Sequence, residues 1–197
     1  KIRSPWYDIQ CQRAAHSMEI AQEIDIDYLG SDYQFFDSRI LDKIQEADIR
    51  DPYLVGDLDY SIESASDGHF IEREKGPLVL WANVDTQGNL PADRDYCLGV
   101  DIAVGTGASN SCISIGDLKT HEKVGEYITS NMKPHELARV AVALARWLKG
   151  STLQSAKMIW EANGPGREFG DTVIELGFRN VYYRVNERSL SQKQSDT

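Results

Sequence analysis

Two acidic residues of the sequence, Asp101 and Glu161, are candidates for a catalytic role. Asp101 lies in the run Tyr96–Val104, where large apolar residues alternate with smaller ones. This alternation predicts a strand, with Asp101 on the same face as the small residue Gly99. Glu161 ends a second predicted strand, Lys157–Glu161. Two carboxylates brought together repel each other unless a divalent ion neutralises them, so the pair predicts a magnesium or manganese site.

Such a site could cleave a phosphodiester. Two bound ions can activate water and stabilise the leaving oxygen, and the carboxylates should then lie roughly 4–8 Å apart. Other interpretations remain open for each residue. Asp101 is predicted in mid-strand, where an unpaired buried carboxylate would cost several kcal/mol, so it needs a cation. Alternatively, Asp101 is bonded to a neighbouring backbone group or to an arginine. Glu161 could be a solvated residue at a strand end.

Two glycine-rich turns adjoin these residues. The turn Gly105–Ser111 invites comparison with a phosphate loop, but it lacks a Walker A lysine and precedes a strand. A plain hairpin turn is the simpler interpretation. No GxxxxGK[ST] motif occurs in the sequence, so we expect no ATP hydrolysis by this chain alone. The turn Asn163–Gly166 follows Glu161, and its glycines predict room for a substrate backbone.

The second half of the chain has a clear pattern of elements that could position these residues. The predicted strands are Tyr96–Val104, Cys112–Asp117, Lys123–Thr129, Lys157–Glu161 and Asn180–Val185, and the predicted helices are Pro134–Lys149 and one from Pro165 to Gly177. The first helix should bury Leu137, Val140, Leu144 and Leu148. The order β-β-β-α-β-α-β is that of a ribonuclease H-like α/β fold with a mixed sheet. In this fold the strands of Asp101 and Glu161 are parallel neighbours.

The first half is less regular. Within residues 1–36, the alternating run Ile24–Tyr28 predicts a strand. Residues 37–92 are acidic and rich in turns, and they predict a linker with a small β-rich subdomain that includes the strand Leu78–Ala82. The predicted fold is therefore a ribonuclease H-like mixed sheet, over residues 93–197, preceded by a small β-rich linker subdomain.

The charge of the chain is unevenly distributed. The net charge is −10, which at first sight disfavours a nucleic-acid partner. Residues 1–93 carry a net −11 and residues 94–197 a net +1, which add to −10. The second half could therefore meet a polyanion without a global penalty. The three cysteines form no CxxC pair, which argues against a disulfide framework or a zinc site.

Three segments resemble one known family, the large terminase subunits that package phage DNA. Ser4–Cys11 with Glu19–Ser31 resembles the end of their ATPase domain, and Tyr96–Gly107 resembles the first strand and turn of their nuclease domain. Trp160–Gly166, followed by Phe169 and Leu176–Phe178, resembles the segment that bears their second acidic ligand. The likeness runs through nearly the whole chain in the expected order.

The resemblance implies a function and partners. It implies that Asp101 and Glu161 are catalytic metal ligands of an endonuclease that uses Mg²⁺ or Mn²⁺, as two ions, to cut concatemeric double-stranded DNA during capsid filling. The implied partners are DNA, the small terminase subunit and the capsid portal, without a membrane, in the host cytoplasm. Residues 1–36 would end the ATPase domain, and residues 93–197 would form an incomplete nuclease domain.

This chain departs from the family pattern at two points. Members often carry an additional Asp two residues after the second turn glycine, where this chain has Ser109. The family's third essential Asp is expected beyond Thr197, because Glu187 and Asp196 are unconvincing substitutes. The ATPase motifs are expected upstream of Lys1.

Two other functions fit parts of the same pattern. The segment from Gly99 to Ile102 and its turn also resemble the first phosphate hairpin of the actin, sugar-kinase and Hsp70 superfamily. That superfamily needs a second glycine-rich phosphate loop, which Asn163–Gly166 matches poorly. A non-catalytic docking scaffold is the other alternative. Metal binding separates the three, since a nuclease binds Mn²⁺ without nucleotide, a kinase-like domain needs nucleotide, and a scaffold needs neither.

Overall fold

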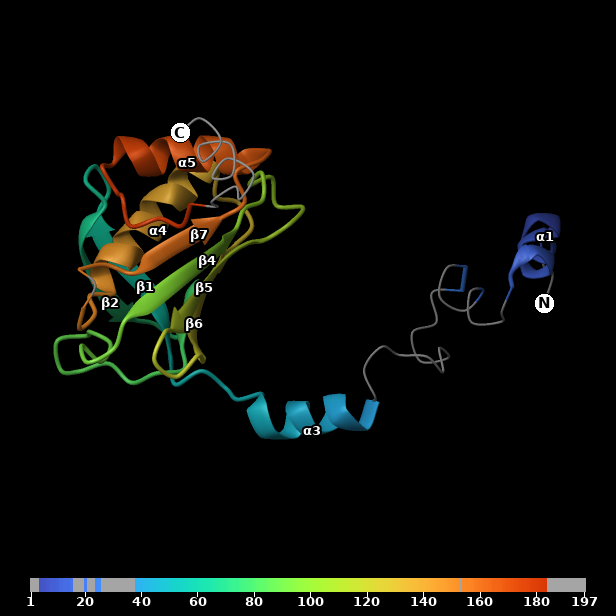
Figure 1. Cartoon of the computed structure of the whole chain (residues 1–197), viewed down its shortest axis with the longest axis horizontal. Helices are drawn as coiled ribbons and strands as arrows, with labels where there is room; N and C mark the ends of the chain where they lie inside the picture. Colours follow the sequence, from blue (N-terminus) through green and yellow to red (C-terminus); the bar gives the residue numbers. More distant parts are fainter. Residues whose placement is uncertain (1–3, 16–19, 21–23, 26–37, 153, 184–197) are drawn as a thin grey trace, which may run out of the picture. The chain divides into compact units, whose positions relative to one another are not determined.

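The computed structural model describes residues 4–15, 20, 24–25, 38–152 and 154–183, with only the backbone of residues 38 and 39. The chain divides into two compact units, Lys1–Arg50 and Asp51–Thr197. The first contains helices α1 (Pro5–Arg13) and α3 (Ser38–Asp48) (Figure 1). Ser4 caps α1 by accepting a hydrogen bond from the Tyr7 N–H (3.2 Å), with Pro5 in the first turn. No helix of the described residues is long and apolar enough to span a membrane.

A mixed sheet of seven strands forms the second unit. Its strands are β1 (Leu54–Ser61), β2 (Ser66–Glu72), β3 (Leu78–Leu80), β4 (Tyr96–Asp101), β5 (Ser111–Asp117), β6 (Lys123–Thr129) and β7 (Lys157–Trp160). Their spatial order is β2-β1-β3-β6-β5-β4-β7. Only the β4–β7 pair is parallel among these strands. The helices α4 (Pro134–Trp147) and α5 (Pro165–Glu175) complete the unit (Figure 1).

The first three strands correct one prediction, that of a separate β-rich subdomain. β3 pairs with β6 through Leu78 and Tyr127, so β1, β2 and β3 extend the same sheet. Arg146 of α4 also donates a hydrogen bond to the Ala65 carbonyl (3.1 Å), which ties the β1–β2 turn to the helix. The local pattern revealed strands in this segment but not their partners. A boundary near residue 92 therefore does not divide the sheet.

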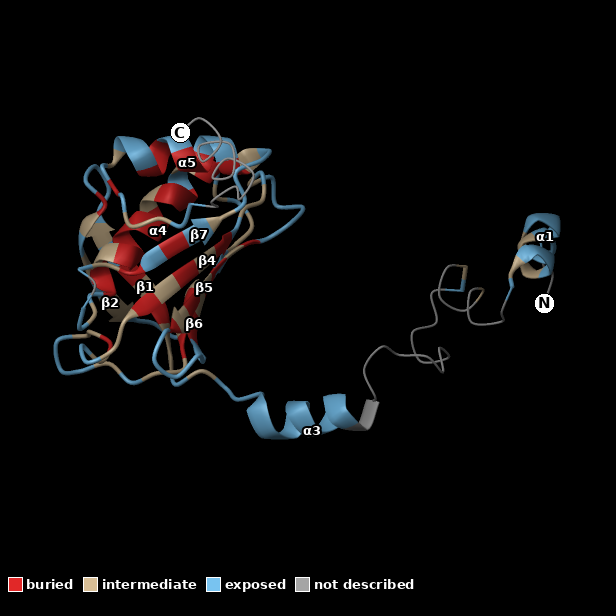
Figure 2. Cartoon of the chain, in the orientation of Figure 1, coloured by how far each residue is buried: buried red, intermediate tan, exposed pale blue. Residues whose placement is uncertain are grey.

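The helix α4 is buried on nearly all sides. The side chains predicted to be buried, Leu137, Val140, Leu144 and Leu148, are all 2% exposed or less. Buried alanines fill much of the remaining surface, because α4 also contacts α5 (Figure 2). The helix begins as predicted at Pro134, where the Lys133 N–H donates to the Glu136 carboxylate (2.8 Å). It ends at Trp147, two residues earlier than predicted.

Other boundaries differ at strand ends. β4 ends at Asp101 rather than Val104, and β7 ends at Trp160. Of the predicted last strand, Val181 forms one isolated parallel bridge with Met158, whereas residues 184–185 lie outside the described part. In the predicted strand Ile24–Tyr28, residues 26–28 lie outside it as well. From β4 to α5 the observed order is β-β-β-α-β-α.

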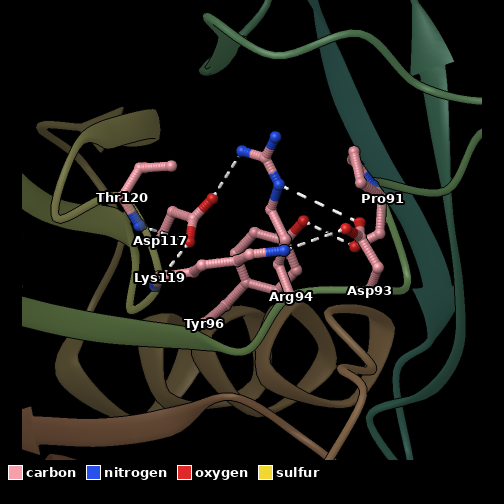
Figure 3. A network of polar contacts seen from close by, with 7 residues as sticks. All are labelled: Pro91, Asp93, Arg94, Tyr96, Asp117, Lys119 and Thr120. Carbon is pink, nitrogen blue, oxygen red and sulfur yellow. Dashed lines mark hydrogen bonds and ion pairs between the residues drawn. The ribbon is translucent and has the colours of Figure 1, made fainter.

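A partly buried ion pair lies at the end of β5 (Figure 3). Asp117, 2% exposed, accepts a hydrogen bond from Arg94 Nη1 at 2.7 Å. It also accepts from the backbone N–H groups of Lys119 (2.7 Å) and Thr120 (3.2 Å) in the β5–β6 turn. Burial alone would raise the pKa of this carboxyl, but these hydrogen bonds outweigh it and hold the pKa below its usual value. No local residue pattern predicts the pairing of Arg94 with Asp117.

Candidate active site

The two faces of the sheet differ. One face packs on α4 and is buried; the other, here called the open face, is covered by no helix among the described residues of this unit. β4 shows the difference, because Leu98 and Val100 are buried while Gly99 is half-buried and Asp101 is exposed (Figure 2). Asp101 therefore shares the open face with Gly99, as the alternation predicted.

The parallel register of β4 and β7 brings the second carboxylate to the first. The ladder ends with the pair Val100–Trp160, and Asp101 and Glu161 are the next residues of the two chains. Neighbouring strands lie about 4.8 Å apart. Ile159 is 46% exposed on the open face, and Glu161 follows it by two residues. The two acidic residues thus lie at adjacent strand ends, on the same face.

Both carboxylates line one hollow in the surface, of about 520 Å³. The other lining residues are Gly99, Val100, Cys112, Ser114, Ile159 and Trp160. The prediction placed Asp101 in mid-strand, where its burial would require a cation. Asp101 is instead the last residue of β4 and is exposed, so this part of the prediction is wrong. A cation is favoured here by the proximity of two carboxylates.

The connection from β4 to β5, residues 102–110, fixes the chain after Asp101. The Ala103 N–H donates to Ser111 Oγ (2.9 Å), outside the strand ladder. Gly105 has a φ of +78°, and a Cβ there would lie 2.3 Å from the Met132 carbonyl oxygen. Only glycine therefore lets the turn pack against the segment before α4. The turn joins two antiparallel strands, as the simpler interpretation predicted.

Another close contact fixes the backbone of Glu161. A Cβ on Gly166 would lie 1.8 Å from the Glu161 carbonyl oxygen, so this glycine lets α5 start directly against β7. Gly166 was expected to admit a substrate backbone, and it admits the helix instead. The Trp160 Nε1–H donates to the Gly166 carbonyl (3.1 Å), which strengthens this contact. Asn163 Nδ2 donates to Glu161 Oε1 (3.0 Å), a partner that sequence reasoning missed.

The pair fits a hard divalent ion. Among the described residues, no cationic side chain forms an ion pair with either carboxylate. Mg²⁺ binds through one or two carboxylates and keeps several waters. No group of three or more His, Cys, Asp or Glu residues that could hold a metal ion occurs in the described part of the chain. Glu187 and Asp196 lie outside that part.

Two other side chains border the pair. Cys112 pairs with Asp101 across β4 and β5, and burial raises the pKa of its thiol above the usual value. A neutral thiol is a poor metal ligand, so the carboxylates remain the better ligands. Ser109, where family members often carry an Asp, lines a second hollow of about 320 Å³ that Asp101 also lines.

No protein-family model and no curated protein matches the chain. Solved structures similar to it include the large terminase nuclease from thermophilic phage G20c, with bound cobalt (TM-score 0.43, 16% identity), magnesium (0.42, 17%) and zinc (0.43, 16%). Each alignment covers 61% of this chain, and between 57% and 63% of the other chain. Each of these structures is of a large terminase nuclease, and this chain spans less than two thirds of its length.

Proposed function

We propose that this chain carries a metal-dependent DNA endonuclease of a viral genome-packaging terminase, with a ribonuclease H-like nuclease domain. Asp101 and Glu161 are its catalytic metal ligands. The observation that carries the proposal is the parallel β4–β7 register, which sets two exposed carboxylates side by side in one hollow. Neither carboxylate is paired with a cation among the described residues, so both are available to a metal ion.

The residues around the pair have distinct tasks. Asp101 and Glu161 would hold Mg²⁺ or Mn²⁺, as two ions, and the metal would supply activation of water and stabilisation of the leaving oxygen of a phosphodiester. Asn163 orients the Glu161 carboxylate through its amide. The hairpin turn at Gly105 and the α5 contact at Gly166 fix the two backbones. The ligands are therefore held in place before the substrate binds.

The wider assignment follows the family resemblance. The substrate is double-stranded DNA, cut from concatemers as the capsid fills, in the host cytoplasm. The small terminase subunit and the capsid portal are the proposed partners. Residues 1–36 are assigned to the end of an ATPase domain, and the nuclease domain of residues 93–197 shares its sheet with the strands β1, β2 and β3.

Metal binding and cleavage test this proposal together. The intact protein, with the third Asp that the family resemblance implies, should bind Mn²⁺ without nucleotide in a calorimetric titration and should nick and cut plasmid DNA. Asp101→Asn and Glu161→Gln should each keep the fold, lose Mn²⁺ binding and lower cleavage by roughly 10³-fold or more. The double variant should be little worse, because the two ligands act as one unit.

The matched control is Asp171→Asn, which removes an exposed carboxylate from α5 and should leave binding and cleavage unchanged. Retained cleavage by folded Asp101→Asn protein would refute the assignment. Mn²⁺ binding that requires a nucleotide would favour the kinase-like alternative instead.

A further inference from the structure

The open face carries an ordered arrangement of side chains beyond its carboxylates. The registers of β5, β4 and β7 align a floor row (Ser114, Gly99, Ile159) and a lysine row (Gly116, Cys97, Lys157) across the strands. A third row, the carboxylate row, consists of the pair Cys112–Asp101 and of Glu161, which directly follows the last pair of the β4–β7 ladder. Successive rows are two residues apart, so each lies about 6.7 Å from the next. Along β4 and β7 the open face thus changes from acidic to uncharged to basic.

The floor row forms the base of the hollow. A Cβ added to Gly99 would have no other atom within 4 Å, so the space above this glycine is open. Its cross-strand neighbours Ser114 and Ile159 also line the hollow, and none of the three carries a charge. An uncharged group suits this floor better than a phosphate does.

The lysine row supplies a cation on the same face. Lys157 is exposed, and its Nζ lies 5.9 Å from the centroid of the Tyr182 ring, within cation–π range. Among the described residues, no carboxylate forms an ion pair with it. Lys157 precedes Glu161 by four residues, which corresponds to about 13 Å along the strand. The lysine is therefore available for an anion at a set distance from the carboxylates.

We propose that one strand of the DNA crosses the open face along β4 and β7. Its scissile phosphate lies at the carboxylate row, the adjacent deoxyribose and base rest above Gly99, and a further phosphate binds Lys157. This path rests on the proposed nuclease function and names the part of the substrate that each row contacts. Because sugars and phosphates carry no sequence information directly, the path favours cleavage with little sequence preference.

Filling the floor tests the first half of the proposal. Gly99→Val adds bulk where no atom lies within 4 Å, and a β-branched residue suits a strand, so the fold should persist. We expect unchanged melting and unchanged Mn²⁺ binding, but cleavage lowered by about tenfold or more, because the DNA is displaced from the ions. Gly99→Ala should have a smaller effect. Wild-type cleavage by Gly99→Val would overturn this path.

The salt dependence of binding tests the second half. In the cleavage-silent double variant Asp101→Asn/Glu161→Gln, a labelled duplex can be titrated at several salt concentrations. Adding Lys157→Gln should reduce the slope of log K against log salt by about 0.9, the value for one lost phosphate contact. Lys157→Arg should keep the slope, and Lys149→Gln, an exposed lysine after α4, should leave it unchanged.

The two proposals fail in different ways. An unchanged slope in Lys157→Gln, while wild-type protein still binds Mn²⁺ and cuts DNA, overturns the strand path and leaves the nuclease intact. Loss of the nuclease proposal would show instead as wild-type cleavage by Asp101→Asn.

Discussion

The same strands present a covered face and an open face, and the two differ in almost every respect. On the covered face, buried side chains such as Leu98 and Ile113 pack into one apolar core with Leu144 of α4. On the open face, Gly99 leaves a hollow and Asp101 is exposed. The covered face therefore stabilises the unit, whereas the open face leaves space and negative charge for a ligand. Substitutions should therefore separate into those that change stability and those that change binding.

The largest change in stability should come from the buried charge. Asp117→Ala should lower the free energy of unfolding by roughly 3–5 kcal/mol, because Arg94 and two backbone N–H groups lose their partner. Urea unfolding measures this, and Mn²⁺ binding by the folded fraction should not change. The exposed neighbour Asp93 provides the control, since Asp93→Ala should cost little. A loss of Mn²⁺ affinity in Asp117→Ala would contradict the expectation that the covered face affects stability alone.

The same pair predicts a pH dependence. The pKa of Asp117 is lowered in the folded state, so its contribution is present above the unfolded value of 3.8. It is lost as pH falls through the lowered folded pKa. The stability difference between wild type and Asp117→Asn should therefore shrink as pH falls from about 4, near the unfolded pKa, to lower values. A difference that stays constant over this range would contradict the assigned charge state.

The next largest loss of stability should come from truncating a side chain of the core. Leu144→Ala should cost roughly 2–5 kcal/mol, since this side chain is 0% exposed between the sheet and α5. Thermal or urea unfolding will measure the loss, and Mn²⁺ affinity should stay at the wild-type value. Melting like the wild type would mean that the helix is peripheral to the fold.

A smaller loss of stability should follow from a change at the contact between α5 and Glu161. Gly166→Ala forces α5 away from the Glu161 carbonyl, because the added Cβ would lie 1.8 Å from that oxygen. We expect a loss of about 1–3 kcal/mol in stability, together with weaker Mn²⁺ binding. Arg167→Ala, at the next position and exposed, should change neither property. Loss of stability without loss of Mn²⁺ affinity would show that α5 does not position the ligand.

The smallest effect should be confined to the open face. Asn163→Ala removes the hydrogen bond to Glu161 Oε1 and should weaken Mn²⁺ binding by about 1 kcal/mol, roughly fivefold. Stability should not change, because Asn163 is exposed. An unchanged affinity in calorimetry would mean that the amide does not orient the carboxylate.

The bounds of helices and strands that depend on local residue patterns could be predicted from the sequence. β6 matches its predicted bounds, and α4 and β5 differ by one or two residues, because apolar spacing and Pro134 determine them locally. The open-face position of Asp101 followed from the same alternation. The pairing of β3 with β6 and the ion pair of Arg94 with Asp117 join distant segments, and no local pattern encodes such partners.

The role of Gly166 illustrates the same limit within the site. Its turn was visible in the sequence, but glycine reveals only that something approaches closely, and here that is the Glu161 carbonyl. The hydrogen bond from Asn163 to Glu161 had a weak signal, an amide two residues after the carboxylate. Such a spacing is common in turns and does not by itself identify a pair.

The parallel pairing of β4 with β7 also sets the order of folding events. Gly99 and Ile159 pair although they are 60 positions apart (159 − 99), with two antiparallel strands and a helix between them. The antiparallel connections from β4 through β6 close short loops and should form early in refolding, whereas this long loop closes slowly. Glu161 joins Asp101 only at that late step. Recovery of Mn²⁺ affinity should therefore lag behind recovery of secondary structure, which makes the metal ion a reporter of the last stage of folding.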